Sequence, residues 1–154
     1  MLSGNVRPSG GMAVYSRIDY HPGYPYSCNS NGIEITAVRF MTAPNIHIFG
    51  IYCPPRVPIA RMCHALSELL TSQSSKLNVF MGDFNVNWLL NNKDKECLQN
   101  LFIRDNSYKQ LVSCYTTDNR TCIDHIYTNL PMSQIRFQIF ETYYTILCYT
   151  NIIQ

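Results

Sequence analysis

The sequence predicts an α/β domain built on mixed β-sheets. Two segments, Ile33–Phe40 and Ile46–Tyr52, have the alternating and β-branched composition of paired strands. A helix with apolar residues at i, i+3, i+4 and i+7 follows at 58–72, and an apolar strand follows the helix at 77–81. Hairpins combined with crossover helices are typical of mixed sheets.

The composition is that of a single globular domain. The chain has 154 residues, of which 46% are hydrophobic and 14% charged, so it can bury a substantial core. The formal charge is only +2 and the twelve Lys and Arg residues form no run, so we expect no broad basic face for polyanions. No apolar run is long enough to cross a bilayer, and no secretory signal is recognised. We expect an intracellular protein, with the nucleus as one candidate location, no membrane partner, and mostly reduced, buried cysteines.

The first third of the chain is predicted to alternate strands with proline-rich connections. The expected elements are a loose segment at 1–9, a strand at 11–18, a long loop at 19–31, and the hairpin strands Ile33–Phe40 and Ile46–Tyr52. The loop prediction follows from Pro22, Gly23 and Pro25, which cannot sustain a ladder of hydrogen bonds. The hairpin should turn at Pro44, and His47 is expected to face outward from its strand.

The rest of the chain begins with a crossover unit. Proline residues at 54 and 55 end the second hairpin strand, and the helix at 58–72 then leads to the strand at 77–81, which should pair parallel to it. Beyond this unit we expect a helix at 94–103, strands at 110–115 and 123–128, an alternating segment at 134–141 and an apolar segment at 143–153.

Polar side chains follow the strand at 77–81. Gly82 is predicted to let the backbone leave the strand, and Asp83 and Asn85 come directly after it. Chemistry in α/β sheets is usually found at the carboxyl ends of strands, and residues two apart share a side if the chain stays extended. The alternative is an Asp-x-Asn turn in which the side chain bonds its own backbone.

Three segments carry chemically useful side chains: Ile51-Tyr-Cys-Pro-Pro55, Met81-Gly-Asp-Phe-Asn85 and Cys122-Ile-Asp-His-Ile-Tyr127. In this order they resemble the endonuclease/exonuclease/phosphatase superfamily, particularly the endonuclease domain of non-LTR retrotransposons and related reverse-transcriptase elements. Two flanks also resemble that group: Gly10-Gly-Met-Ala-Val-Tyr15 precedes the hairpin, and Thr128-Asn129 follows the third segment. The resemblance covers the chain from about Gly10 to Tyr144.

The resemblance implies a sandwich of two mixed β-sheets flanked by helices, and hydrolysis of a DNA phosphodiester by water with the help of Mg²⁺ or Mn²⁺. It implies that Asp83 orients or deprotonates the water. Asn85 would bind the phosphate or the metal, and Tyr52 would donate to a phosphate oxygen. Asp124 would be the carboxylate that holds a catalytic histidine in the right tautomer.

Each of these residues also has an ordinary structural explanation. Tyr52 could be a half-buried aromatic residue at a strand end, and Asp124 an acid on the wet face of a strand. His125 is not expected to serve as the missing base, because neighbouring strand residues point to opposite faces.

The sequence departs from the family pattern in two places. No residue matches the metal-binding glutamate expected before the Gly-Gly strand: Asn5 is the only amide there, and Glu34 falls on a later hairpin. The Ser-Asp-His expected near the end is replaced by Thr145-Ile146-Leu147. We therefore expect a partial domain over 10–154 with impaired or absent activity, and exposed sheet edges that favour self-association. The open alternatives are a non-catalytic module that binds nucleic acid or protein, and a phospholipid or inositol-phosphate substrate.

Overall fold

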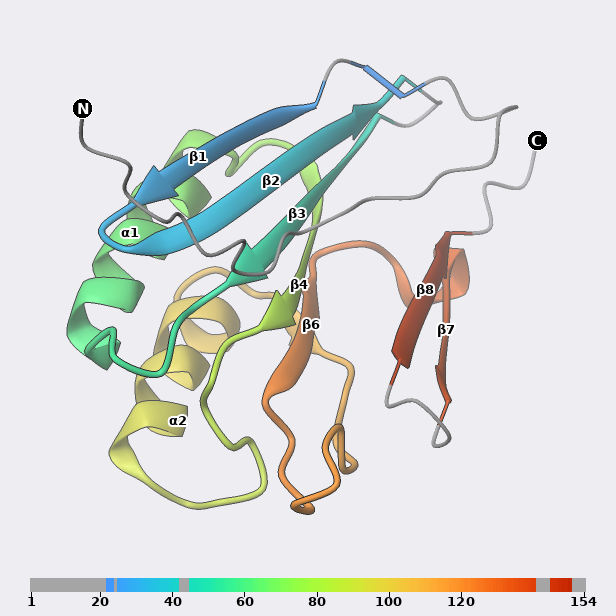
Figure 1. Cartoon of the computed structure of the whole chain (residues 1–154). Coiled ribbons are helices and arrows are strands. Elements are labelled where there is room, and N and C mark those ends of the chain that lie inside the picture. The colour runs from blue at the N-terminus through green and yellow to red at the C-terminus, as the bar shows by residue number, and fades with distance from the viewer. Residues whose placement is uncertain (1–21, 24, 42–44, 141–144, 151–154) are drawn as a thin grey trace, which may run out of the picture.

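The computed structural model describes residues 22–23, 25–41, 45–140 and 145–150, with the backbone alone described for 134–140 and 145–150. Its main feature is an open, six-stranded mixed sheet in the order β1-β2-β3-β4-β6-β5 with helices packed against it (Figure 1). The strands of this sheet are β1 (Tyr26–Ser30), β2 (Ile33–Phe40), β3 (Ile46–Tyr52), β4 (Leu77–Asp83), β5 (Lys109–Gln110) and β6 (Asp124–Thr128). The α/β class and the mixed sheet predicted from the sequence are confirmed.

The helices and a second sheet complete the described chain. The helices are α1 (Ile59–Ser72), α2 (Lys93–Leu98), the π-helix η1 (Gln99–Arg104) and the short 3-10 helix η2 (Met132–Gln134). Strands β7 (Ile135–Phe140) and β8 (Thr145–Thr150) form a separate antiparallel pair. No helix in the described ranges has the length and hydropathy to span a bilayer.

The predicted crossover unit is confirmed. Strands β2 and β3 pair antiparallel, and β3 pairs parallel with β4 after α1. Helix α1 begins after Pro58, whose missing N–H is no loss at a helix start. It buries Met62, Ala65, Leu66 and Leu70 against the sheet, the face predicted from the apolar spacing.

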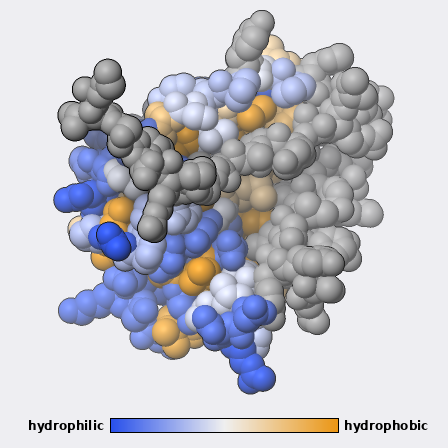
Figure 2. All heavy atoms as spheres, viewed as in Figure 1, coloured by the Kyte–Doolittle hydropathy of each residue, from blue (hydrophilic) through white to orange (hydrophobic). Residues whose placement is uncertain are grey.

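The main sheet carries apolar side chains on both faces. On the helix side, Phe49 of β3 and Phe80 of β4 stack with ring centroids 4.6 Å apart and join the buried residues of α1, α2 and η1. On the opposite face, Val79 and Ile126 belong to a smaller buried cluster that includes no helix residue. In the face seen in Figure 2, the described surface is mostly hydrophilic with small, separate hydrophobic groups.

The structure corrects the predicted loop at 19–31. Its last part is strand β1, which pairs antiparallel with β2. The prolines lie before this strand and leave its amides free to pair. The turn between the strands is Asn31-Gly32, with φ of 56° and 86°, and an Asn-Gly pair is the strongest short signal for a hairpin. The loop prediction rested on the proline-rich part of the segment and did not use this signal.

Strand β4 is longer than predicted. Gly82 does not end the strand, because pairing with β3 and β6 continues through Asp83. A Cβ at Gly82 would lie 2.0 Å from the carbonyl oxygen of Ile51, and φ at Gly82 is 138°. The glycine therefore allows a close approach of two strands, rather than an exit from the sheet.

Two further expectations need correction. Of the strand expected at 110–115, only Gln110 pairs, within β5. The amide of Leu111 still donates to Ile126, but Val112 then turns into the core and the chain leaves β6. The helix expected at 94–103 is present, but its second half is η1. The strand expected at 11–18, the turn at Pro44 and the domain boundary near residue 10 lie outside the described residues.

Candidate active site

Three of the four predicted site residues lie in one row across the sheet. Tyr52 at the end of β3 pairs with Asp83 at the end of β4, and Asp83 pairs with Asp124 at the start of β6. Directly paired residues project to the same face, here the face opposite the helices. The sheet therefore brings together side chains that are 72 positions apart in the sequence, Tyr52 and Asp124. We call this row, together with Asn85, the catalytic edge.

Backbone hydrogen bonds hold the three strand ends together beyond the ladder itself. The amide of Cys53 donates to the carbonyl of Asp83 at 2.8 Å. The amide of Phe84 donates to the carbonyl of Ile123 at 2.9 Å. The chain on either side of Asp83 is thus fixed to both neighbouring strands, which places its carboxylate on a rigid element.

Asn85 reaches the catalytic edge by a turn and not by continued extension. Its φ is 52°, a left-handed conformation that Asn tolerates. The Asp83 Oδ1 atom accepts the amide hydrogen of Asn85 at 2.9 Å, which is the turn considered as an alternative from the sequence. The Asn85 side chain then donates from Nδ2 to the carbonyl of Cys53 at 2.7 Å. The turn at Asp83 therefore also places the Asn85 side chain beside the end of β3.

The two carboxyl groups of the catalytic edge share an environment that disfavours their charge. Burial raises the pKa of Asp83, and the neighbouring Asp124 carboxylate raises it further, while hydrogen bonds from Asn85 lower it. Burial also raises the pKa of Asp124, and a hydrogen bond from Thr116 opposes this effect. Both groups remain partly accessible, and Tyr52 is 36% exposed. Such paired, perturbed carboxyl groups are common at functional sites.

His125 lies on the other face of the sheet, as the alternation of strand side chains predicts. It is fully buried and stacks on Phe84. Its Nε2 donates to the carbonyl of Val86 at 2.8 Å, so Nδ1 accepts the hydroxyl hydrogen of Tyr127 at 3.0 Å. Burial lowers the pKa of His125 to about 4, so the ring is neutral at pH 7.

The other described histidines also lie away from the catalytic edge. His47 lies near the beginning of β3, at the far end of the strand from Tyr52. His64 is exposed on α1, 3.6 Å from Glu68. No histidine in the described ranges can therefore be the partner that the resemblance implies for Asp124.

Two supporting residues were missed in the sequence analysis. Thr116 is buried, and its Oγ1 accepts the amide hydrogens of Ile123 and Asp124 at 3.1 and 3.2 Å. Asn87 Oδ1 accepts the amide hydrogen of Cys122 at 3.1 Å, which ties the loop after β4 to the chain before β6. Both lie in polar loops, where no local pattern distinguishes a supporting residue from a solvated one.

Glu34 lies in the same row, where it pairs with Tyr52 on one side and with Asn29 of β1 on the other. It is two strands from Asp83, roughly 10 Å at ordinary strand spacing. The sequence analysis gave Glu34 no role. Its distance from the two aspartates agrees with that choice.

The catalytic edge contains oxygen donors that suit a divalent ion. Asp83, Asp124 and Asn85 offer hard oxygen atoms of the kind that Mg²⁺ prefers. Within the described ranges, however, no group of three or more His, Cys, Asp or Glu side chains converges on one point. Two carboxylates and one amide match the oxygen donors that a protein usually gives to Mg²⁺, which takes one or two carboxylates and completes its shell with water and substrate phosphate.

Comparison with known proteins identifies the fold. The chain is similar to the endonuclease domain of TRAS1, a telomere-specific non-LTR retrotransposon, with 13% identity over 90% of this chain and 72% of that domain, at a TM-score of 0.66. It is also similar to the human nocturnin catalytic domain with a bound sulfate anion, with 12% identity over 77% of this chain and 51% of that one, at a TM-score of 0.53. No protein-family description and no curated protein matches the sequence.

Proposed function

We propose that this chain, which has the fold of endonuclease/exonuclease/phosphatase proteins, binds a nucleic-acid phosphodiester at the catalytic edge and hydrolyses it slowly. The observation that carries the proposal is the row of Tyr52, Asp83 and Asp124 on three neighbouring strand ends. A retrotransposon endonuclease domain of the same fold favours DNA as the nucleic acid. The phosphodiester would then be recognised by the side chains of the catalytic edge, and not by a broad basic surface.

Asp83 is the residue we assign to the attacking water. A general base must be deprotonated to accept a proton, and its pKa should approach the working pH. Burial and the charge of Asp124 both raise the pKa of Asp83, which strengthens it as a base. The rate should consequently rise with pH as Asp83 loses its proton.

The remaining residues act on the phosphate. The Tyr52 hydroxyl is a donor for a non-bridging oxygen, and its partial exposure leaves it accessible. The Asn85 amide uses one donor on the Cys53 carbonyl and has a second N–H for the same phosphate. Asp124 acts through Asp83 by keeping the pKa of that carboxyl group raised. It is therefore a positioning residue in this chain.

The resemblance implies a divalent ion, and we propose Asp83, Asp124 and Asn85 as its oxygen donors. When bound, such an ion would neutralise charge on the phosphate. No residue of the sequence matches the metal-binding glutamate that the resemblance implies, so no step above passes through the ion. Loss of members of a catalytic unit lowers rates by about 10³-fold or more, which is why we expect slow turnover.

Nicking of supercoiled plasmid DNA by the purified chain tests the proposal. The assay would contain Mg²⁺ or Mn²⁺ and compare the wild type with Asp83→Ala and Asp105→Ala. Asp105 is an exposed acid after η1, so its substitution is a matched control. We expect slow nicking that is lost in Asp83→Ala and retained in Asp105→Ala. Nicking that survives in Asp83→Ala would refute the assignment, and DNA binding without any nicking would favour a non-catalytic binding module.

A further inference from the structure

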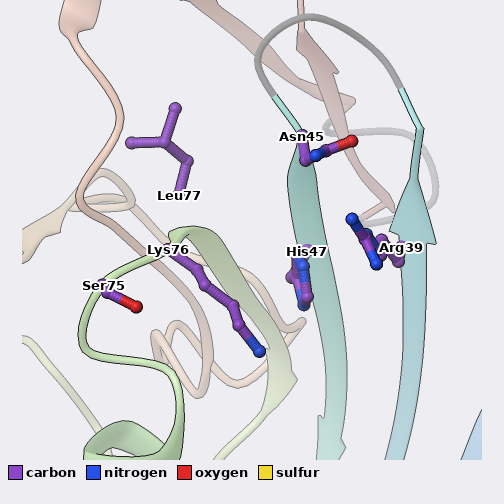
Figure 3. Close-up of a pocket in the computed structure, with 6 residues that line it drawn as sticks. All are labelled: Arg39, Asn45, His47, Ser75, Lys76 and Leu77. Carbon is purple, nitrogen blue, oxygen red and sulfur yellow. The ribbon is translucent and has the colours of Figure 1, made fainter.

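A pocket lies at the end of the main sheet opposite the catalytic edge. It has a volume of about 320 Å³, at the lower end of the roughly 300–1,000 Å³ typical of small-molecule sites. Figure 3 shows the residues that line it: Arg39, Asn45, His47, Ser75, Lys76 and Leu77. They come from the end of β2, the beginning of β3, and the connection between α1 and β4.

The sheet places two of the basic residues side by side. Arg39 of β2 pairs directly with His47 of β3, so both side chains project to one face of the sheet. This is the helix face, because the His47 ring stacks with that of Phe49, which belongs to the helix-side core. The pocket and the catalytic edge therefore lie on opposite faces.

The third basic residue is held by a buried polar clamp. Asn78 is fully buried, and its Nδ2 donates to the carbonyls of Gln73 and Lys76 at 3.0 and 3.1 Å. Asn129 also donates to the Lys76 carbonyl, at 2.8 Å. The backbone of Lys76 is thus fixed from two directions, and the Lys76 ammonium group donates to the neutral Gln73 Oε1 at 2.9 Å.

The electrostatics of the pocket favour an anion. Burial lowers the pKa of His47, and the charges of Lys76 and Arg39 lower it further. The three basic groups are thus close enough to affect one another, and none of the six lining residues is acidic. The lowered pKa leaves the His47 ring neutral at pH 7, so Lys76 and Arg39 carry the positive charge that would attract an anion.

We propose that this pocket binds the phosphate group of a small anion. A phosphate offers several acceptor oxygens, which match the ammonium group of Lys76, the hydroxyl of Ser75 and a ring N–H of His47. From His47 to Tyr52 the strand advances five residues, roughly 17 Å. The pocket is therefore separate from the proposed phosphodiester site, and its ligand is not the phosphate that is cleaved.

Calorimetric titration of the full chain with inorganic phosphate at constant ionic strength tests this site. The variant is Lys76→Gln, and the control is Lys93→Gln, which removes an exposed lysine on α2 outside the pocket. We expect saturable binding that weakens about tenfold in Lys76→Gln and is unchanged in Lys93→Gln, as for loss of one charged hydrogen bond. Equal urea midpoints for the two variants would show that both are folded. If Lys76→Gln does not fold, Arg39→Gln serves as the second variant.

A second titration distinguishes the source of the phosphate group. If inorganic phosphate displaces a short single-stranded oligonucleotide from the wild type but not from Lys76→Gln, one phosphate of the nucleic-acid strand occupies the pocket. If inorganic phosphate does not change the binding of the oligonucleotide, the ligand of the pocket is a free small anion. Absence of saturable phosphate binding to the wild type, or equal binding by Lys76→Gln and Lys93→Gln, would overturn the proposal.

Discussion

Replacement of Gly82 by alanine should be far more damaging than its small size suggests. The added Cβ would lie 2.0 Å from the Ile51 carbonyl oxygen and 3.0 Å from the Ile51 carbonyl carbon and amide nitrogen. These are backbone atoms of a paired strand, so no side-chain rotation can relieve the contact. The Ile51 carbonyl would have to move by about 1 Å to reach even the shortest tolerable Cβ contact, which disrupts the β3–β4 ladder.

The magnitude follows from two contributions. A non-glycine residue at positive φ costs about 1–3 kcal/mol, and φ at Gly82 is 138°. Displacement of buried ladder groups costs about 1–3 kcal/mol for each hydrogen bond left unmade. We therefore expect Gly82→Ala to lower the free energy of unfolding by about 2–6 kcal/mol, a large part of the stability of an ordinary domain.

Gly32→Ala is the matched control. It makes the same substitution at a positive φ, 86°, but the nearest atom to the new Cβ is the Val57 Cγ2 at an ordinary 3.4 Å. This variant should lose only the conformational contribution, about 1–2 kcal/mol. The difference between the two variants isolates the contact with Ile51.

Urea unfolding followed by tryptophan fluorescence would measure both variants. The chain has a single tryptophan, Trp88, which packs against His125 and Tyr127 and so reports on the folded core. We expect the two free energies of unfolding to differ by about 1–3 kcal/mol, the cost of a ladder hydrogen bond that the contact with Ile51 leaves unmade. A difference below about 1 kcal/mol would mean that β3 and β4 do not approach as closely as described, and the geometry of the catalytic edge would lose its support.

Three further predictions concern stability. The pKa of His125 is lowered from 6.5 to about 4, so between these pH values the unfolded chain binds a proton more readily than the folded chain does. The free energy of unfolding should therefore fall by up to about 3 kcal/mol as the pH drops from 6.5 to 4. Asp83 and Asp124, whose pKa values are raised, act in the opposite direction. Urea unfolding across this range should give a smaller acid-induced loss for His125→Asn than for the wild type, and equal losses would contradict the neutral, buried ring. Asn78→Ala removes three hydrogen bonds of a buried side chain, to the carbonyls of Gln73 and Lys76 and to the Tyr108 hydroxyl, so a drop of about 2–3 kcal/mol in the free energy of unfolding is expected, and a loss below about 0.5 kcal/mol would argue against the clamp. Asn92→Ala removes the side-chain acceptor for the Lys95 amide at the start of α2, and thermal unfolding should show a loss of about 1 kcal/mol, whereas an unchanged midpoint would deny the cap.

The regular part of the fold was predictable because its signals are local. Strands β2 and β3 alternate in hydropathy, and α1 has a clear helical period, so their bounds agree with the structure within a residue. The parallel pairing of β3 with β4 followed from the helix between them. Two errors have tertiary causes: Gly82 is required by the backbone of a neighbouring strand, and core packing draws the segment after Gln110 away from β6. The third error, the missed strand β1, concerns a local signal, the Asn31-Gly32 turn.

The candidate site was only partly accessible to sequence reasoning. Asp83 and Asn85 stand out because they follow an apolar strand, but nothing local connects them with Asp124, which lies 41 positions after Asp83. The resemblance supplied that connection, and the strand register now gives its geometric form. The pocket around Lys76 had no sequence signal, because its residues come from three separated segments. The self-association expected from the sequence stays a prediction.

The conservative substitution Asp83→Asn tests the central claim most directly, with nicking and DNA binding measured on the same preparation. The amide keeps the shape of the carboxyl group and its place beside Asn85, but it cannot accept a proton from water. It also removes a negative charge next to the proposed phosphate, so binding of a short DNA duplex, followed by fluorescence anisotropy, should be retained or tightened while nicking is lost. Unchanged nicking, or loss of binding together with nicking in a folded protein, would contradict the assignment of Asp83 as the base of a phosphodiester site.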